Sequence, residues 1–371
     1  MSWTQKTLGE IVNLKRGFDL PSSCRVDGPY PVFSSSGQTG THSEAAVKGP
    51  CVITGRYGTI GQVFYSDAAC WPLNTSLYST EFKGNDPKFV YYLLKTLPWR
   101  DYLTASAVPG INRNHVHLCP VCVPDYETQT AISGVLGSLD NKIELNTKLN
   151  GYLEELAALE FSRRFGEIES SIDLGKVLSI STKTLKPQNC HGEIWEHYSI
   201  PAYDANRRPV FELADGIKSN KYVIDANCIL ISKLNPSSRR IWMPACSSKR
   251  AVCSTEFIVY KPKNPVHKAF YYAAIGAPAF RDFLLAHVTG STGSRQRTQP
   301  KATLTYPIPN PGLEAVEDFC AFANPLYEQI KVNERNSKQL EELRDALLPK
   351  LMTGEIDVSK LDLKQLNSHL A

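Results

Sequence analysis

The segment over residues 290–301 carries the side chains best suited to chemistry in this sequence, and that chemistry is hydrogen bonding to nucleic acid. It reads Gly-Ser-Thr-Gly-Ser-Arg-Gln-Arg-Thr-Gln-Pro-Lys and contains no acidic residue. Arginine can donate two hydrogen bonds to guanine, glutamine pairs with adenine, and lysine and hydroxyl groups contact phosphates. The segment therefore predicts DNA contacts by Arg295, Gln296, Arg297 and Lys301.

Three other segments offer similar side chains. The counterpart loop at 106–115, the glycine-rich turn at 55–61 and the acid-free stretch at 231–250 each combine polar or cationic residues. A loop that only faces solvent remains the alternative for each single residue. The further candidates for DNA contact are Arg56, Tyr57, Asn112, Arg113, Asn114, Lys233, Arg239 and Arg240.

Motifs for enzyme chemistry are missing from the sequence. It has no Gly-x-x-x-x-Gly-Lys-Ser/Thr loop for a nucleotide phosphate and no Asn-Pro-Pro-Tyr or Asp-Pro-Pro-Tyr of an adenine methyltransferase. The pair Cys119 and Cys122 lacks the second pair that a structural zinc site needs, and His115-x-His117 also stands alone. We expect no catalytic residue, no metal and no cofactor, with an unrecognised catalytic site as the alternative.

Length and composition favour a globular protein of two or three domains. The chain has 371 residues, of which 42% are hydrophobic, and no apolar run is long enough to span a membrane. The first residues lack the apolar stretch of a secretory signal, and the ten cysteines are scattered. We expect reduced thiols and a cytoplasmic protein.

Charge divides the chain into alternating blocks. Residues 170–312 carry 19 Lys or Arg and nine Asp or Glu, a net charge of +10, and residues 1–124 carry a net charge of +3. Residues 125–169 and 313–371 are acidic, with net charges of −5 and −4. Basic blocks favour a polyanionic partner, whereas acidic helical blocks favour solvent or a protein partner.

An internal repeat follows the same division. Ile143-Glu144-Leu145-Asn146 becomes Ile330-Lys331-Val332-Asn333 when 187 is added to each number. Leu8-Gly9-Glu10-Ile11 matches Leu174-Gly175-Lys176-Val177 at a shift of 166. A shift that grows along the chain indicates a duplication whose second copy gained insertions.

Both acidic segments have the spacing of long helices. Apolar residues recur mostly at steps of three and four, and each stripe is interrupted by asparagines, the second one at Asn333 and Asn336. The first helix is expected over about 128–164, roughly 55 Å long, and Pro349 is expected to end or kink the second. We expect the helices to pair antiparallel, with separate packing on each block as the alternative. The expected interface residues are Leu139, Ile143, Asn146, Leu153, Leu156, Leu326, Ile330, Asn333, Leu340 and Leu343.

The globular blocks alternate short β-like runs with turns and short helices. Cys51–Thr54, Cys228–Ile231 and Phe257–Tyr260 are expected strands, and 89–94 and 269–275 are expected helices. The predicted fold is a mixed α/β (α+β) chain with two globular domains related by a pseudo-twofold axis and separated by two long antiparallel coiled-coil helices. The expected domains are 1–125, 126–166, 167–312 and 313–371.

With these residues in view, the chain resembles the specificity subunit of type I restriction–modification systems over nearly its whole length. The resemblance is carried by the C-terminal sequence Leu347-Leu348-Pro349-Lys350-Leu351-Met352-Thr353-Gly354-Glu355-Ile356 and by the N-terminal Leu8-Gly9-Glu10-Ile11. Gln129-x-x-Ile132 after Pro124 and the two-copy layout add to it.

The resemblance implies a non-catalytic targeting subunit that acts in DNA methylation and phage defence. Each globular block would be a target-recognition domain that reads half of an asymmetric site in double-stranded DNA. The helices would form the coiled coil, on which two methyltransferase subunits dock and which motor–nuclease subunits join. Base-reading residues differ among family members, so none is carried over. The rivals are a stand-alone sequence-specific DNA-binding protein, a protein-binding scaffold and an enzyme with an unrecognised site.

Overall fold

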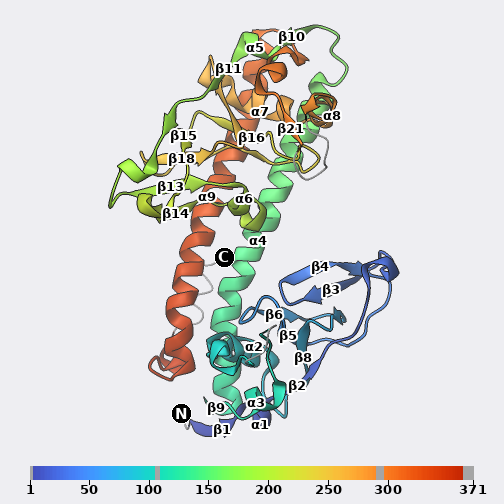
Figure 1. Cartoon of the computed structure of the whole chain (residues 1–371), viewed down its shortest axis with the longest axis vertical. Helices are drawn as coiled ribbons and strands as arrows, with labels where there is room; N and C mark the ends of the chain where they lie inside the picture. The colour runs from blue at the N-terminus through green and yellow to red at the C-terminus, as the bar shows by residue number, and fades with distance from the viewer. Residues whose placement is uncertain (1–2, 105–108, 290–295, 362–371) are drawn as a thin grey trace. The chain divides into compact units, whose positions relative to one another are not determined.

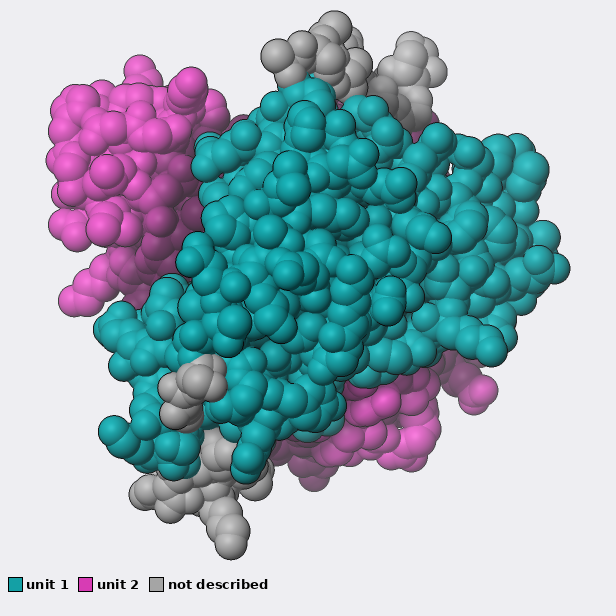
Figure 2. Space-filling model, turned by 90° about the horizontal axis from the view of Figure 1, so that it is seen from below, with its two compact units in different colours: residues 1–146, 336–371 teal, residues 147–335 magenta. Residues whose placement is uncertain are grey.

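The computed structural model describes residues 3–104, 109–289 and 296–361, and it divides into two compact units (Figures 1 and 2). Unit 1 comprises Met1–Asn146 and Asn336–Ala371, and unit 2 comprises Thr147–Arg335. Each unit contains one globular block and part of both long helices, α4 (Tyr126–Phe165) and α9 (Leu313–Met352). The predicted mixture of strands and helices with two long helical segments is confirmed.

Unit 1 is built from small sheets with short helices packed beside them. A four-stranded antiparallel sheet has the order β2-β8-β5-β6, a three-stranded sheet has the order β4-β3-β7, and β1 pairs with β9. The run expected as a strand at Cys51–Thr54 lies in β5, whose five residues are all buried. The strands are β1 (Thr4–Thr7), β2 (Asn13–Arg16), β3 (Tyr30–Ser34), β4 (Gly37–His42), β5 (Cys51–Gly55), β6 (Val63–Ser66), β7 (Trp71–Pro72), β8 (Ser76–Glu81) and β9 (Pro120–Val123).

Unit 2 repeats the four-stranded sheet in the order β11-β19-β16-β17 and adds a five-stranded sheet, β12-β15-β18-β13-β14. The larger second sheet agrees with the insertions expected in the second copy. The strands are β10 (Ser171–Asp173), β11 (Leu178–Ser181), β12 (Thr184–Leu185), β13 (Ile194–Tyr198), β14 (Val210–Leu213), β15 (Lys221–Val223), β16 (Ile229–Ser232), β17 (Ile241–Trp242), β18 (Ala251–Ser254), β19 (Phe257–Pro262), β20 (Val288–Thr289), β21 (Arg297–Thr298) and β22 (Pro307–Pro309).

Two of the short helices of unit 1 have counterparts at matching places in unit 2. The expected helices are confirmed as α2 and α7. At the start of α2, the Asp86 carboxylate accepts a hydrogen bond from the Phe89 amide at 2.7 Å, and Pro87 occupies the first turn. The helices are α1 (Leu8–Ile11), α2 (Pro87–Thr96), α3 (Arg113–His117), α5 (Leu174–Val177), α6 (Ile200–Asn206), α7 (Lys268–Gly276) and α8 (Pro278–Ala286).

In unit 1, the first half of α4 runs antiparallel to the second half of α9. Asn146 Nδ2 donates to Ser337 Oγ at 3.1 Å, and Arg344 Nη1 donates to Asp140 Oδ1 at 2.6 Å, so residue numbers fall on one helix as they rise on the other. The Tyr92 hydroxyl of α2 also donates to Asp140, at 2.6 Å, and thereby ties the globular block to the helices.

In unit 2, the rest of α4 pairs antiparallel with the first half of α9. Asn333 Nδ2 donates to Asn150 Oδ1 at 2.8 Å, and the rings of Phe161 and Phe319 meet edge to face. The 187-residue shift converts Asn146 into Asn333 and Asn150 into Ser337, so the amide hydrogen bond of unit 1 has its repeat equivalent here.

The predicted place of two leucines in the helix–helix interface is wrong. Leu156 and Leu343 are 46% and 42% exposed, because the buried seam passes through their neighbours Ala157 and Arg344 instead. Asn336, expected to interrupt the second stripe, is exposed, and Ser337 takes its place at 1% exposure. Pro349 does not end α9, which continues to Met352. None of the helices in the described part of the chain has the length and apolar character needed to cross a membrane.

Candidate nucleic-acid interface

The candidate residues of unit 1 meet where the end of β5, the start of β8 and the chain before α3 join. We call residues 55–58, 75 and 110–114 the unit 1 junction. The Arg56 amide donates to the Thr75 carbonyl at 2.8 Å, and the Ile111 amide donates to the Arg56 carbonyl at 2.9 Å. These backbone bonds bring Arg56, Tyr57 and Asn112–Asn114 together, as a site would require.

The Tyr57 ring lies directly on Gly110. A Cβ at Gly110 would stand 2.2 Å from Tyr57 Cε1, so only glycine leaves room for the ring. The Arg56 guanidinium lies 4.6 Å from the centre of the same ring, a cation–π distance. The three residues therefore hold one another in place.

A hollow of about 310 Å³ opens beside this junction. Among the described residues, neither Arg56 nor Arg113 forms an ion pair, and both line the hollow. Arg16 of β2, which pairs with Asp19 at 3.4 Å, lines it too and was missed from the sequence, because only the pairing of β2 with β8 brings it there. Asn112 has a structural task as well, since its side chain accepts a hydrogen bond from the Asn114 amide at 3.0 Å. Like-charged guanidinium groups around one hollow favour an anionic ligand.

The unit 2 junction comprises residues 232–235, 256 and 296–301. The Lys233 amide donates to the Glu256 carbonyl at 3.0 Å, and the Thr298 amide donates to the Lys233 carbonyl at 3.0 Å. Leu234 forms an isolated bridge with Arg297, and the Asn235 amide donates to the Gln296 carbonyl. Lys233, Gln296 and Arg297 thus come together, Lys301 is exposed four residues further on, and Arg295 lies outside the described residues.

The two junctions have the same backbone. Ile111 donating to Arg56 is matched by Thr298 donating to Lys233, and Arg56 donating to Thr75 is matched by Lys233 donating to Glu256. The bridge between Tyr57 and Gly110 corresponds to that between Leu234 and Arg297. Gly58 and Asn235, next in each turn, both have positive φ, at 78° and 49°. The side chains at the matching places differ in type, although Arg56 and Lys233 are both cationic.

Arg297 is the cation of the unit 2 junction with a defined partner. Its Nε and Nη2 atoms donate to the two carboxylate oxygens of Glu256 at 3.0 and 3.1 Å, and these bonds raise the pKa of Arg297. Its side chain is 48% exposed. Glu256 was missed from the sequence, because it lies 41 residues from Arg297 and only the fold joins them.

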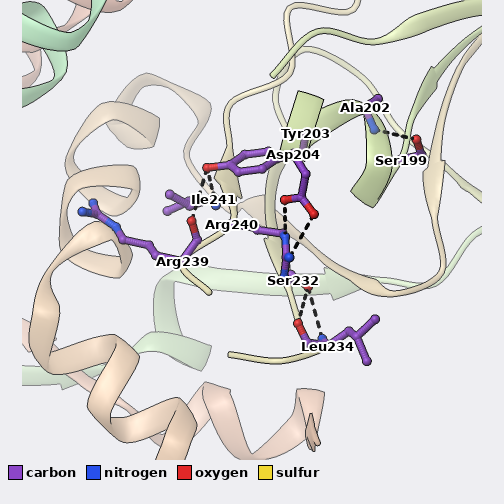
Figure 3. A network of polar contacts seen from close by, with 9 residues as sticks. All are labelled: Ser199, Ala202, Tyr203, Asp204, Ser232, Leu234, Arg239, Arg240 and Ile241. Atoms are coloured by element: carbon purple, nitrogen blue, oxygen red, sulfur yellow. Dashed lines mark hydrogen bonds and ion pairs between the residues drawn. The ribbon is translucent and has the colours of Figure 1, made fainter. Parts of the chain in front are cut away.

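The backbone of Arg240 adjoins the unit 2 junction, because its carbonyl accepts a hydrogen bond from the Ser232 amide at 2.9 Å, but the side chains of Arg239 and Arg240 point in different directions (Figure 3). Arg240 is only 14% exposed and donates to both oxygens of Asp204, at 2.6 and 2.9 Å, so two of its donors are used inside unit 2, and its DNA contact stays a prediction. Arg239 points away from Arg240 and lines another hollow, of about 430 Å³, together with Tyr203 and Arg207.

The histidine and cysteine pairs considered for metal binding or catalysis lie in ordinary packed or exposed positions. The ring of His117 accepts a hydrogen bond from the Leu14 amide at Nε2, and burial lowers its pKa, with Arg113 adding to the effect. Cys119 is buried whereas Cys122 is exposed. Within the described ranges, no three His, Cys, Asp or Glu side chains gather in a way that could hold a metal ion.

A second apolar stripe runs along the exposed side of α4. Its members are spaced four, three, four and three residues apart, which is the heptad spacing of a helix that packs on another helix. None is buried against its own unit, since their exposed fractions range from 42% to 67%. We call these residues the exposed seam: Leu145, Leu149, Tyr152, Leu156 and Leu159.

The chain is similar to known specificity subunits of type I restriction enzymes. Residues 1–155 match the family model of the type I restriction modification DNA specificity domain. The chain is 23% identical to the HindI specificity subunit of Haemophilus influenzae, covering 95% of this chain and 99% of that protein. It is 25% identical to the MjaIX specificity subunit of Methanocaldococcus jannaschii, over 85% and 79% of the two chains.

The fold is shared with a solved structure. The S subunit of a type I restriction–modification system from M. genitalium superposes with a TM-score of 0.57 at 16% identity, over 94% of this chain and 96% of that one. The resemblance of the chain to type I specificity subunits, predicted from its sequence, is therefore confirmed.

Proposed function

We propose that this chain is the non-catalytic DNA-sequence-recognition subunit of a type I restriction–modification complex, with each unit reading one half of a bipartite, asymmetric site in double-stranded DNA. One observation carries the proposal. The same three-segment backbone junction occurs once in each unit, yet it presents different side chains, such as Arg56 and Tyr57 in one and Lys233 and Leu234 in the other.

Two readers in one chain have a physical advantage. A good two-pronged contact to a base discriminates by about 1–3 kcal/mol, so a single junction distinguishes few base pairs. Two junctions on one polypeptide add their discrimination. Because their side chains have diverged, the two half-sites can differ in sequence.

We propose that the long helices set the distance between the half-sites and bind the partner subunits. Paired helices that keep their register through the Asn146–Ser337 and Asn333–Asn150 hydrogen bonds would set the unread spacer between the half-sites. The exposed seam of α4 would dock one methyltransferase subunit, and a second one would dock elsewhere on the helical region. Motor–nuclease subunits would complete the restriction complex.

Exchange of one globular block tests whether each unit reads its half-site independently of the other. Residues 170–312 are replaced by the matching segment of a relative with another target, and the methylated sites are sequenced in cells that also express the methyltransferase. One half of the target should change, and the half read by unit 1 should stay the same. A change in both halves would contradict independent reading by the two units.

The alternative is a stand-alone sequence-specific DNA-binding protein. It predicts tight, specific binding by the purified chain. A recognition subunit is expected to bind weakly or to associate with itself when alone, because its exposed seam is uncovered. Binding of the chain to labelled duplex DNA with and without the methyltransferase, over a range of salt concentrations, separates the two.

A further inference from the structure

The ion pair between Arg297 and Glu256 has the geometry of a support for base reading. The guanidinium approaches the carboxylate with two parallel hydrogen bonds, at 3.0 and 3.1 Å, which fixes the plane of the group as well as its position. A guanidinium has five N–H donors, more than the two that a carboxylate pair needs. The Arg297 side chain remains 48% exposed, whereas Glu256 is 28% exposed and lies deeper.

Both partners are fixed to the same frame. The Glu256 carbonyl accepts from the Lys233 amide, and its own amide donates to Ser254 Oγ at 3.2 Å. The residue after Arg297, Thr298, is 1% exposed and donates its amide to the Lys233 carbonyl. The pair therefore differs from a surface pair between two mobile side chains, and it holds Arg297 in one orientation before any ligand arrives.

The unit 1 junction cannot hold a matching ion pair. The positions matching Glu256 and Arg297 are Thr75 and Gly110. The Tyr57 ring fills the space beside Gly110, and the matching residue in unit 2 is Leu234, which is smaller. An aromatic ring over glycine in one junction is thus exchanged for a leucine beside an arginine in the other.

We propose that Glu256 is a positioning residue that presents Arg297 to a guanine in the half-site read by unit 2, so that this pair determines specificity at one base pair. Pre-orientation matters because binding a flexible arginine costs the entropy of its rotamers, whereas a fixed one loses little on contact. Guanine is the base whose O6 and N7 accept two bonds from one guanidinium. The proposal deepens the proposed function and rests on it.

The test uses the full-length chain with its methyltransferase subunit and a library of duplex DNA with randomised positions. Glu256→Ala should reduce the preference for guanine at one position about tenfold. Overall DNA affinity should rise, because one negative charge is removed from a DNA-facing surface. Arg297→Ala should abolish preference at the same position, and the double variant should match Arg297→Ala alone. Glu256→Asp should restore part of the preference.

Glu193→Ala is the matched control, because it removes another partly exposed acid of unit 2, the partner of Arg250 at 3.2 Å. It should leave every base preference unchanged. The proposal is overturned if Glu256→Ala weakens all positions alike, or if its effect falls in the other half-site. A wild-type complex that enriches no sequence would overturn the proposed function itself, and this inference with it.

Discussion

Tyr57 occupies the space that any side chain at position 110 would need. Gly110→Ala would place a methyl group where the ring now lies, 2.2 Å from Cε1. The ring must move, and Arg56 loses the surface it lies on. We expect about a tenfold loss of discrimination in the half-site that unit 1 is proposed to read, measured by competition between duplexes altered in one half at a time.

The matched control for this change is Gly134→Ala on α4. A Cβ there meets nothing within 4 Å, and alanine is the better helix former, so folding should be unharmed or stabilised by up to about 1 kcal/mol. Equal losses in both half-sites for Gly110→Ala would indicate general unfolding and would count against the junction as a reading site.

Sequence alone located most members of both junctions, because arginine and amide side chains beside glycine are recognisable without a fold. It missed Arg16, Thr75 and Glu256, whose places depend on strand pairing. It could not show that Arg240 pairs with Asp204, since the two residues lie 36 positions apart along the chain. Local composition identifies donors, but contacts between distant segments decide which donors are already satisfied.

At the scale of elements, periodicity predicted both long helices but not how their faces are used. The apolar residues of α4 form two stripes, the seam with α9 and the exposed seam, whereas the sequence predicts a single stripe. Steps of three and four fit both, since the stripes differ only by a rotation about the helix axis. The exposure of Leu156 beside the buried Ala157 separates them.

The exposed seam gives a prediction for assembly. Leu149→Glu with Tyr152→Glu should weaken association with the methyltransferase by tenfold or more, because two side chains that are 42% and 67% exposed lose about 1 kcal/mol or more each of apolar burial. The free energy of unfolding should change little. Affinity is measured by titrating the methyltransferase subunit, with thermal unfolding of the chain alone as a check.

The repeat supplies the control for that experiment. Adding 187 to Leu149 and Tyr152 gives Asn336 and Gln339 on α9, which are already polar. Asn336→Glu with Gln339→Glu adds the same charge but removes no apolar surface, so methyltransferase binding should be retained. If both double variants weakened binding equally, charge rather than the apolar seam would be responsible.

At the scale of the whole molecule, the two long helices must keep equal lengths if together they set the distance between the half-sites, as proposed. Seven residues inserted after Asn146 and seven after Arg335 preserve the heptad register of both helices and lengthen each by about 10 Å. That length corresponds to about three base pairs of duplex. We expect the unread spacer of the methylated site to grow while both half-site sequences stay the same, with weaker binding because the duplex also turns.

Insertion in one helix alone is the informative contrast. Seven residues after Asn146 only would move Asn150 away from Asn333, while Asn146 keeps Ser337 in unit 1, so the helix pair could not satisfy both hydrogen bonds in one register. Thermal unfolding should then shift to lower temperature, which the paired insertion should avoid. Methylation-site sequencing of the paired variant decides the spacer role, because altered half-site sequences would mean that the helices shape the readers themselves rather than the distance between them.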